Sequence, residues 1–254
     1  MHDGLKKKNS KTIVITGGLK GIGLSITKAF LINGYNVVCG SRNYVDVIKD
    51  ENFHFLETDV KYENGHTRLV KEAISKTGRI DAYINNAGFS EWKSIEQIDD
   101  NFLNNILDTN LKSAFWGAKS SLNYLSKNGV IINISSIAGK RGSANNSAYS
   151  ASKFGMNGLT QSLSKELGPR GIRVNAICPV LIGTEGLINA LEKNESPSEE
   201  DPYKFIKKFA KNNSALLRMP TGDEIAQMCI FLVSSKASAI TGQCINVDCG
   251  VFPQ

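Results

Sequence analysis

The stretch Thr12-Ile-Val-Ile-Thr16-Gly17-Gly18-Leu19-Lys20-Gly21-Ile22-Gly23 decides the fold. Five consecutive β-branched residues predict a strand that is buried on both faces, as in a parallel sheet. Glycines follow at once, and a helical pattern covers 21–33. Glycine in this setting permits a tight turn, a close approach of the backbone to a pyrophosphate, and close packing of helix on strand. This strand, turn and helix predict a dinucleotide-binding unit.

Short apolar runs alternate with helical patterns along the rest of the chain, which indicates an α/β protein with a parallel sheet. The expected strands are Thr12–Thr16, Asn36–Gly40, Phe53–Thr58, Ile80–Asn85, Val130–Ser135, Arg173–Cys178 and Gln243–Val247. The expected helices lie near 21–33, 63–77, 101–127, 147–168 and 222–234. We predict a single Rossmann-like, doubly wound domain over 11–254 after a flexible basic tail at 1–10. The excursion at 183–215 is typical of a substrate loop or lid, with a surface insertion as the alternative.

Composition excludes several classes of protein. The 254 residues are 41% hydrophobic and 21% charged, as in an ordinary globular protein. The sequence shows neither an apolar run of about 20 residues nor a secretion signal, so we expect a cytoplasmic protein without a membrane partner. The five cysteines form no CxxC pair and the three histidines have no ligand spacing, which predicts packing roles and no metal. The net charge of +6 owes much to a short lysine-rich start, which is more typical of a solvated end than of a nucleic-acid-binding arm.

The segment after the second strand indicates which dinucleotide is bound. An acidic residue about 20 residues after the glycine turn would accept hydrogen bonds from a free ribose 2′-hydroxyl. The chain instead has Ser41-Arg42-Asn43. Arg42 can form a charge-assisted fork with a 2′-phosphate, and Lys20 in the glycine turn can reach the same group. The sequence therefore predicts NADP(H); the alternative is that both are solvated surface charges.

A second constellation carries proton-transfer chemistry. Tyr149 and Lys153 are four residues apart in a helical stretch and share one face. An adjacent ammonium lowers a phenol pKa from about 10, so Tyr149 can serve as a general acid toward a carbonyl oxygen. Ser136 follows a strand, at the edge of the sheet where ligands bind. Asn110 lies within 101–127 and either faces solvent or bonds a water in the site.

These motifs occur in the order found in the short-chain dehydrogenase/reductase family, which the chain resembles from Thr12 to about Gly250. The resemblance is carried by the turn at 16–23, Asp59-Val60, Asn85-Asn86-Ala87-Gly88, Asn110, Ser136, Tyr149, Lys153, Asn175, Pro179, Thr184 and the 241–248 ending. It implies a seven-stranded parallel sheet and a homotetramer, with a homodimer as the alternative.

The resemblance also implies residue roles. Tyr149 would exchange the proton, Lys153 would lower its pKa and bind the nicotinamide ribose, Ser136 would orient the carbonyl, and Asn110 would hold a proton-relay water. The implied cofactor-binding residues are Gly17, Lys20, Gly21, Ile22, Gly23, Arg42, Asp59, Val60, Asn86, Ala87, Gly88, Tyr149, Lys153, Pro179 and Thr184. Two positions depart from the family pattern: Val180 stands where glycine is usual, and Cys249 replaces a second glycine.

The resemblance implies an NADPH-dependent oxidoreductase that reduces a carbonyl to an alcohol, with a 3-oxoacyl thioester as the leading substrate. Basic residues near Lys127 and Arg170 receive an acyl carrier protein in related reductases, so this carrier is a candidate partner. Phe89, Trp92 and the loop 140–146 are expected to border the substrate. The alternatives are a sugar or polyol dehydrogenase of the same family and a catalytically silent NADP-binding scaffold.

Overall fold

The computed structural model describes residues 10–253, so the predicted basic tail at 1–10 lies outside the described residues apart from Ser10. Seven parallel strands form one sheet in the order β3-β2-β1-β4-β5-β6-β7. The strands are β1 (Thr12–Thr16), β2 (Asn36–Ser41), β3 (Phe53–Glu57), β4 (Ile80–Asn85), β5 (Leu125–Ile134), β6 (Arg173–Pro179) and β7 (Cys244–Val247). The predicted α/β, Rossmann-like sheet of seven strands is confirmed.

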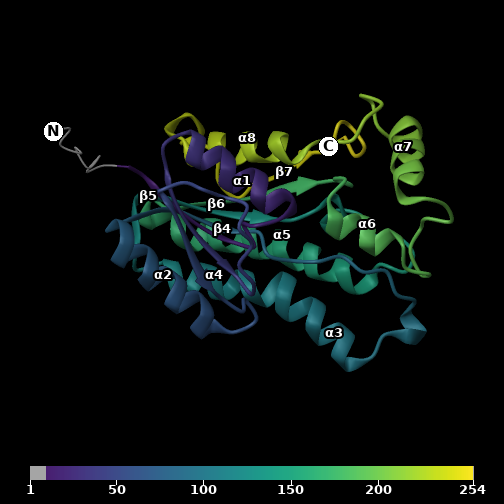
Figure 1. Cartoon of the computed structure of the whole chain (residues 1–254), viewed down its shortest axis with the longest axis horizontal. Coiled ribbons are helices and arrows are strands. Elements are labelled where there is room, and N and C mark those ends of the chain that lie inside the picture. The colour runs from purple at the N-terminus through teal and green to yellow at the C-terminus, as the bar shows by residue number, and fades with distance from the viewer. Residues whose placement is uncertain (1–9, 254) are drawn as a thin grey trace.

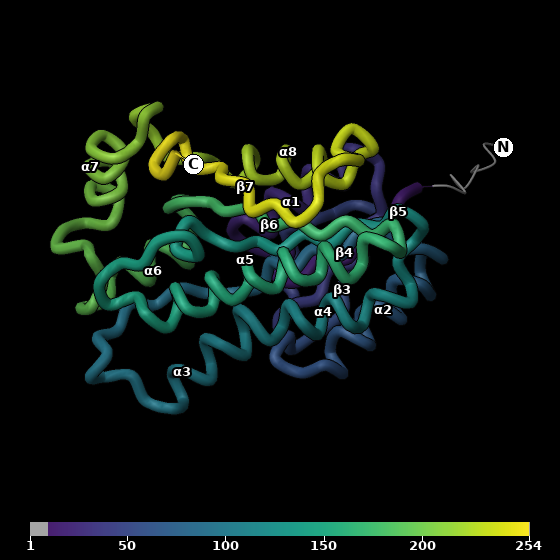
Figure 2. The backbone as a smooth tube through the Cα atoms, turned by 180° about the vertical axis from the view of Figure 1, so that it is seen from behind, coloured from purple at the N-terminus to yellow at the C-terminus, as the bar shows by residue number. Residues whose placement is uncertain are grey.

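Two layers of helices cover the sheet, as Figures 1 and 2 show from opposite sides. The helices are α1 (Gly21–Ile32), α2 (Glu63–Thr77), α3 (Asp100–Leu107), α4 (Ser113–Ser121), α5 (Ser147–Leu167), α6 (Glu185–Leu191), α7 (Pro202–Asn213) and α8 (Gly222–Val233). Helices α1 and α8 pack together on one face, while α2, α4 and α5 cover the other. Such a doubly wound arrangement leaves a crevice at the carboxyl edge between β1 and β4, where the strand order reverses.

Alternation along β1 builds a core on each face of the sheet. Ile13 and Ile15 are fully buried against α1 and α8, whereas Val14 points to the opposite face. There Leu69 and Val70 of α2 join it in a second buried cluster. Because successive strand side chains point to opposite faces, a strand covered on both sides must be apolar throughout. This is the physical reason for the uninterrupted β-branched run.

The predicted helix at 101–127 is wrong in its extent. The segment forms α3, a π-helical stretch at Asp108–Lys112 and α4, and β5 already begins at Leu125. Leu125 pairs with Ile80 across a register shift before the regular pairing resumes at Val130. The strand partner thus overrides the local helical pattern at 125–127. The other predicted helices and strands are present, with ends that differ by one or a few residues.

The excursion at 183–215 contains the two short helices α6 and α7, which stand beyond the carboxyl edge of the sheet (Figure 1). Asp201 caps α7 by accepting a hydrogen bond from the Lys204 amide, and Thr184 caps α6 through the Leu187 amide. In residues 10–253, no helix has the length and apolar character to cross a membrane.

The contact between α4 and the sheet gives a stability prediction. A Cβ at Gly117 would overlap the Asn85 side chain and lie 2.6 Å from Cε1 of the buried Tyr83 ring. Gly117→Ala should therefore lower the free energy of unfolding by about 1–3 kcal/mol, as overpacked cores do.

Gly158→Ala is the matched control, because a Cβ on this exposed residue of α5 meets nothing within 4 Å. It should raise stability by up to about 1 kcal/mol through helix propensity. Urea denaturation measures both variants. Equal effects of the two substitutions would contradict the close packing of α4.

Candidate active site

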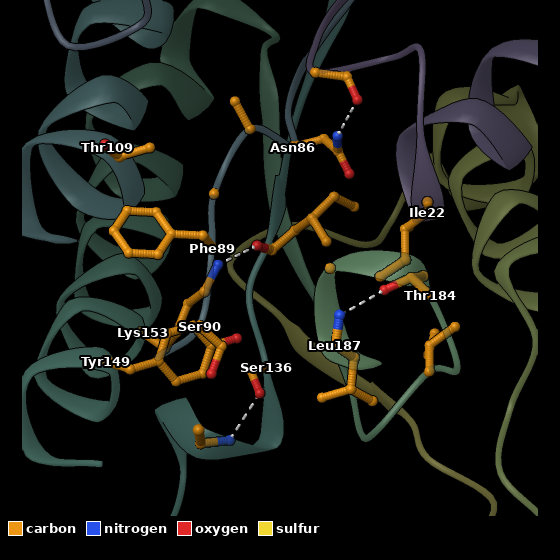
Figure 3. A pocket seen from close by; sticks show the side chains of 18 of the residues that line it. Ile22, Asn86, Phe89, Ser90, Thr109, Ser136, Tyr149, Lys153, Thr184 and Leu187 are labelled. Atoms are coloured by element: carbon orange, nitrogen blue, oxygen red, sulfur yellow. Dashed lines mark hydrogen bonds between the residues drawn. The ribbon is translucent and has the colours of Figure 1, made fainter. Parts of the chain in front are cut away.

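A cavity of about 760 Å³ opens at the carboxyl edge of the sheet. Its walls come from the glycine turn after β1, the segments after β2, β3 and β4, the start of α5, and the excursion at 183–215. In Figure 3, Tyr149, Lys153 and Ser136 gather on one side of this cavity, and Ile22 and Thr184 lie on the other. One continuous space therefore joins the predicted dinucleotide turn to the predicted proton-transfer residues.

The glycine turn has a backbone that other residues could not adopt without strain. Gly17 and Gly21 have φ values of +69° and +52°, in the left-handed region. A Cβ at Gly23 would overlap the carbonyl oxygen of Gly17, and one at Gly21 would press on Thr184. The glycines therefore let α1 and Thr184 pack closely against the turn, and the turn borders the cavity. We refer to this glycine turn, 17–23, as the cradle; a turn of this kind lets a backbone approach a pyrophosphate.

Helix α1 points its N-terminus at this cradle. Its N-cap residue, Lys20, makes no side-chain cap. Free N–H groups at a helix start favour an anion. Lys20 and Arg42 are exposed and line the cavity, where they follow the neighbouring strands β1 and β2. The two cations predicted to contact a 2′-phosphate thus line the same cavity.

Thr16 ties the turn to the end of β4. Its Oγ1 accepts hydrogen bonds from the amides of Asn86 and Ala87, each at 3.1 Å. The Asn86 side chain makes two further hydrogen bonds to the turn: its Nδ2 donates to the carbonyl oxygens of Thr16 at 2.9 Å and of Gly17 at 3.0 Å. Asn86 and Ala87 are predicted site residues, whereas no function is predicted for Thr16 itself. The position of Thr16, at the end of a buried strand and next to a glycine turn, is the feature of the sequence that could have indicated this role.

Tyr149 and Lys153 lie one helical turn apart in α5, as the spacing predicts. The Lys153 side chain is 4% exposed, and its Nζ lies 5.7 Å from the Tyr149 ring centroid and donates to the Ile134 carbonyl at 2.8 Å. Ser136 Oγ accepts a hydrogen bond from the Ala138 amide at 3.1 Å and also interacts with the Tyr149 hydroxyl. Two hydroxyls and one ammonium thus face the cavity together.

Burial has the largest effect on the pKa values of Tyr149 and Lys153. For Tyr149, burial raises the pKa, the hydrogen bond from Ser136 lowers it, and the neighbouring Cys178 raises it further. Burial also lowers the pKa of Lys153 to about 8. We expected the Lys153 ammonium to lower the pKa of Tyr149; in the structure burial outweighs the lowering influences and the net shift is upward. A Tyr149 that stays protonated at neutral pH is available as a proton donor.

Asn110 does not line the cavity. It is fully buried in the π-helical stretch, where its Oδ1 accepts from the Phe89 amide at 2.9 Å and its Nδ2 donates to the Phe89 carbonyl at 2.8 Å. The side chain therefore fixes the segment after β4. The prediction that Asn110 either faces solvent or bonds a water is wrong in its first alternative, because the side chain is buried. Its predicted hold on a relay water stays a prediction.

All other predicted site residues except Pro179 line the cavity. Pro179 ends β6, and Val180 lines the cavity in its place. The Cβ of Val180 causes no left-handed strain, since its φ is not positive, but Cys249 does adopt a φ of +55°. Among residues 10–253, no group of three or more His, Cys, Asp or Glu side chains is placed to hold a metal.

Part of the cavity wall is apolar. The predicted Phe89 and Trp92 line the cavity, as do Leu187, Phe205 and Phe209 of the excursion, and Trp92 packs with Leu187 and Phe205 in one cluster. The excursion is also tied to the segment after β4, since Lys193 Nζ lies 2.7 Å from the Glu91 carboxylate and Gln97 donates to Glu195 at 3.0 Å. The loop 140–146 contributes Arg141, Gly142, Ser143, Ala144 and Asn146 to the lining.

Lys127 and Arg170 lie far from this cavity in the same chain. Lys127 is near the start of β5, at the opposite edge of the sheet, and Arg170 follows the carboxyl end of α5. Tyr149 is at the other end of that 21-residue helix, which is about 30 Å long. These two residues therefore do not border the cavity of their own chain.

The fold and site define a Rossmann-like nucleotide-binding protein with a tyrosine–lysine–serine centre. The family model described as Enoyl-(Acyl carrier protein) reductase matches residues 17–252. The chain belongs to the short-chain dehydrogenases/reductases and is an oxidoreductase of the kind that acts on CH–OH and C=O groups.

Relatives of different substrate classes resemble the chain to a similar degree. It is 32% identical to the 3-oxoacyl-[acyl-carrier-protein] reductase of Chlamydia muridarum over 95% of this chain and 97% of that protein. The solved aldohexose dehydrogenase of Thermoplasma acidophilum is 28% identical with a TM-score of 0.88, covering 97% of this chain and 98% of that one. The 3-ketoacyl-(acyl-carrier-protein) reductase of Brucella melitensis, solved with NADH, is 26% identical with a TM-score of 0.83, over 96% and 99% of the two chains.

The buried lysine gives a pH prediction for the ligand-free protein. Between about pH 8 and pH 10.5 the unfolded chain holds a proton on Lys153 that the folded chain has released. Lys153 therefore makes stability rise with pH across this window. Urea denaturation of wild type and Lys153→Met at several pH values should show the rise in wild type relative to the variant. A constant difference between the two would contradict the lowered pKa.

Proposed function

We propose that the chain reduces a ketone carbonyl to an alcohol with NADPH, using Tyr149 as the general acid. The observation that carries this proposal is the single cavity that has the glycine cradle and two cations at one end and Tyr149, Ser136 and Lys153 at the other. A silent scaffold would not need a buried ammonium beside an ionisable hydroxyl, because burying a charge costs free energy.

The residues present fit a dinucleotide. The cradle of Gly17, Gly21 and Gly23, which lines the cavity, and the start of α1, which has no side-chain cap, suit its pyrophosphate. Asp59 and Val60 line the end of the cavity proposed for adenine, and Thr184 borders the region proposed for nicotinamide. When bound, the nicotinamide supplies the hydride. Lys20 and Arg42 supply the positive charge that favours a ribose 2′-phosphate, and this charge is the basis for proposing NADPH rather than NADH.

Proton transfer follows from the positions of the two hydroxyls. Ser136 donates to the carbonyl oxygen and orients it beside Tyr149, which releases its proton to the same oxygen as negative charge develops there. The ammonium of Lys153 then stabilises the phenolate that Tyr149 becomes. Asn110 holds the segment after β4 in position beside these residues through its two hydrogen bonds to the Phe89 backbone. We propose that the excursion at 183–215 closes over the substrate and excludes water.

The apolar wall favours a 3-oxoacyl thioester over a polyhydric sugar. Trp92, Leu187, Phe205 and Phe209 offer surface to an acyl group but few hydrogen-bond partners for several hydroxyls. If an acyl carrier protein delivers the substrate, we propose that it contacts Lys127 and Arg170 of a neighbouring copy of the chain. This mode of delivery requires an oligomer, such as the expected homotetramer. A sugar or polyol dehydrogenase is the second candidate, supported by the aldohexose dehydrogenase among the solved relatives.

Tyr149→Phe should lower kcat by at least about 10²–10⁴-fold while NADPH still binds, because the general acid is lost and the ring remains. NADPH oxidation is followed with a panel of acetoacetyl thioesters, diketones, aldehydes and keto sugars, and diols are tested with NADP⁺. Tyr124→Phe is the control, since this exposed tyrosine lies outside the cavity. Full turnover in Tyr149→Phe would overturn the proposed mechanism. Oxidation of diols without reduction of any thioester would favour the second candidate.

Arg42→Asp should reverse cofactor preference. Loss of a charge-assisted hydrogen bond of about 1.5–3 kcal/mol predicts a fall of about 10- to 100-fold in kcat/KM for NADPH, while NADH gains relative to it. Arg68→Asp is the matched control, because it makes the same charge change at an exposed residue of α2 outside the cavity. An unchanged ratio of NADPH to NADH activity in Arg42→Asp would show that Arg42 does not contact the 2′-phosphate.

A further inference from the structure

A fully buried histidine lies behind the segment that joins β3 to α2. His66 is in the first turns of α2, and both nitrogens of its ring are engaged. Its Nδ1 lies 2.7 Å from the hydroxyl of Tyr83 on β4, and its Nε2 lies 2.9 Å from the carbonyl oxygen of Val60. Neither His66 nor Tyr83 lines the cavity, whereas Val60 does.

The two partners determine the tautomer of the ring. A carbonyl oxygen can only accept, so Nε2 must carry a hydrogen and donate it to Val60. In the neutral ring Nδ1 is then the acceptor, and the Tyr83 hydroxyl donates to it. Burial lowers the pKa of His66, which keeps this neutral form at neutral pH. The result is a directed chain of hydrogen bonds from Tyr83 through His66 to Val60.

Both ends of this series of hydrogen bonds, Tyr83 and Val60, are held in place by further contacts. Gly117 of α4 packs against the Tyr83 ring, and Tyr83 lies on β4 three residues before Asn86, which follows the strand. At the other end, Thr58 donates its amide to the Ser41 carbonyl at 2.9 Å, and the Asp59 carboxylate accepts from the Lys61 amide at 3.0 Å. These two bonds fix the flanks of Val60, and His66 fixes its carbonyl.

We propose that His66 is a positioning residue for the adenosine half of the dinucleotide, which holds the Asp59–Val60 segment against the cavity by anchoring the Val60 carbonyl to Tyr83. This inference rests on the proposed binding of a dinucleotide in the cavity. Without the anchor, the buried Val60 carbonyl loses its partner and the segment shifts to find another. The adenosine site is then no longer preformed, and the cost of ordering it is subtracted from the affinity.

The test compares variants that keep or remove the donor to Val60. His66→Leu removes it, whereas His66→Gln places an amide near the position of Nε2 and can still donate. Tyr83→Phe keeps the packing of the ring and removes only the hydroxyl that fixes the tautomer. Ser121→Ala is the control for loss of a buried hydrogen bond elsewhere, since its Oγ bonds the Ala118 carbonyl within α4.

Calorimetry measures the affinity for NADPH and for the adenosine half alone, as adenosine 2′,5′-bisphosphate and AMP. Wild type is expected to bind at least one of these adenosine ligands. For that ligand, His66→Leu should raise Kd by about 3- to 10-fold, which is the equivalent of one hydrogen bond. His66→Gln should recover most of that loss, and Tyr83→Phe should lie between the two. In turnover, KM for the cofactor should rise while kcat at saturating cofactor stays near the wild-type value.

Three other outcomes overturn the proposal at different levels. If wild type binds adenosine phosphates and folded His66→Leu or Tyr83→Phe binds them equally well, His66 does not position this site. If Ser121→Ala weakens binding as much as the His66 variants, the effect is general destabilisation. If wild type itself binds neither NADPH nor the adenosine ligands, the proposed cofactor fails and this inference fails with it.

Discussion

The hydrogen bonds between the ends of β1 and β4 are the constraint on which the site depends. The sheet order reverses between these strands, so the helices that follow them diverge to opposite faces and leave a crevice. Thr16 and Asn86 cross that crevice at its base. They fix the separation of the glycine turn from the segment that Asn110 holds through Phe89. The two sides of the cavity thus share one rigid frame.

A balance of burial and hydrogen bonding sets the chemistry available at the other end of the cavity. Lys153 is nearly inaccessible to solvent, yet its ammonium bonds the Ile134 carbonyl and faces the Tyr149 ring. Desolvation pushes both groups toward their neutral forms, which raises the pKa of Tyr149 and lowers that of Lys153. Ser136 opposes this for Tyr149. Around a side chain as buried as Lys153, each remaining polar contact counts for more.

The sequence was most informative where structure is determined locally. The strand Thr12–Thr16 and the Tyr149–Lys153 spacing were predicted because they depend on alternation and on helical period. The helix expected at 101–127 failed because the pairing of Leu125 with Ile80, 45 positions earlier, converts its end into strand. The partners of Asn110 and of His66 could not be predicted either, since Phe89 and Tyr83 approach them only after the sheet and its helices have packed.

The walls of the cavity come from separate parts of the chain. The glycine turn and the segments after β2, β3 and β4 lie within the first 92 residues, whereas much of the apolar wall belongs to the excursion at 183–215. That excursion contributes no strand to the sheet. Insertions, deletions or exchanges there would leave the strand pairing untouched. In evolutionary terms, changes in one contiguous stretch of the gene can reshape part of the cavity wall while the strands of the sheet are inherited intact.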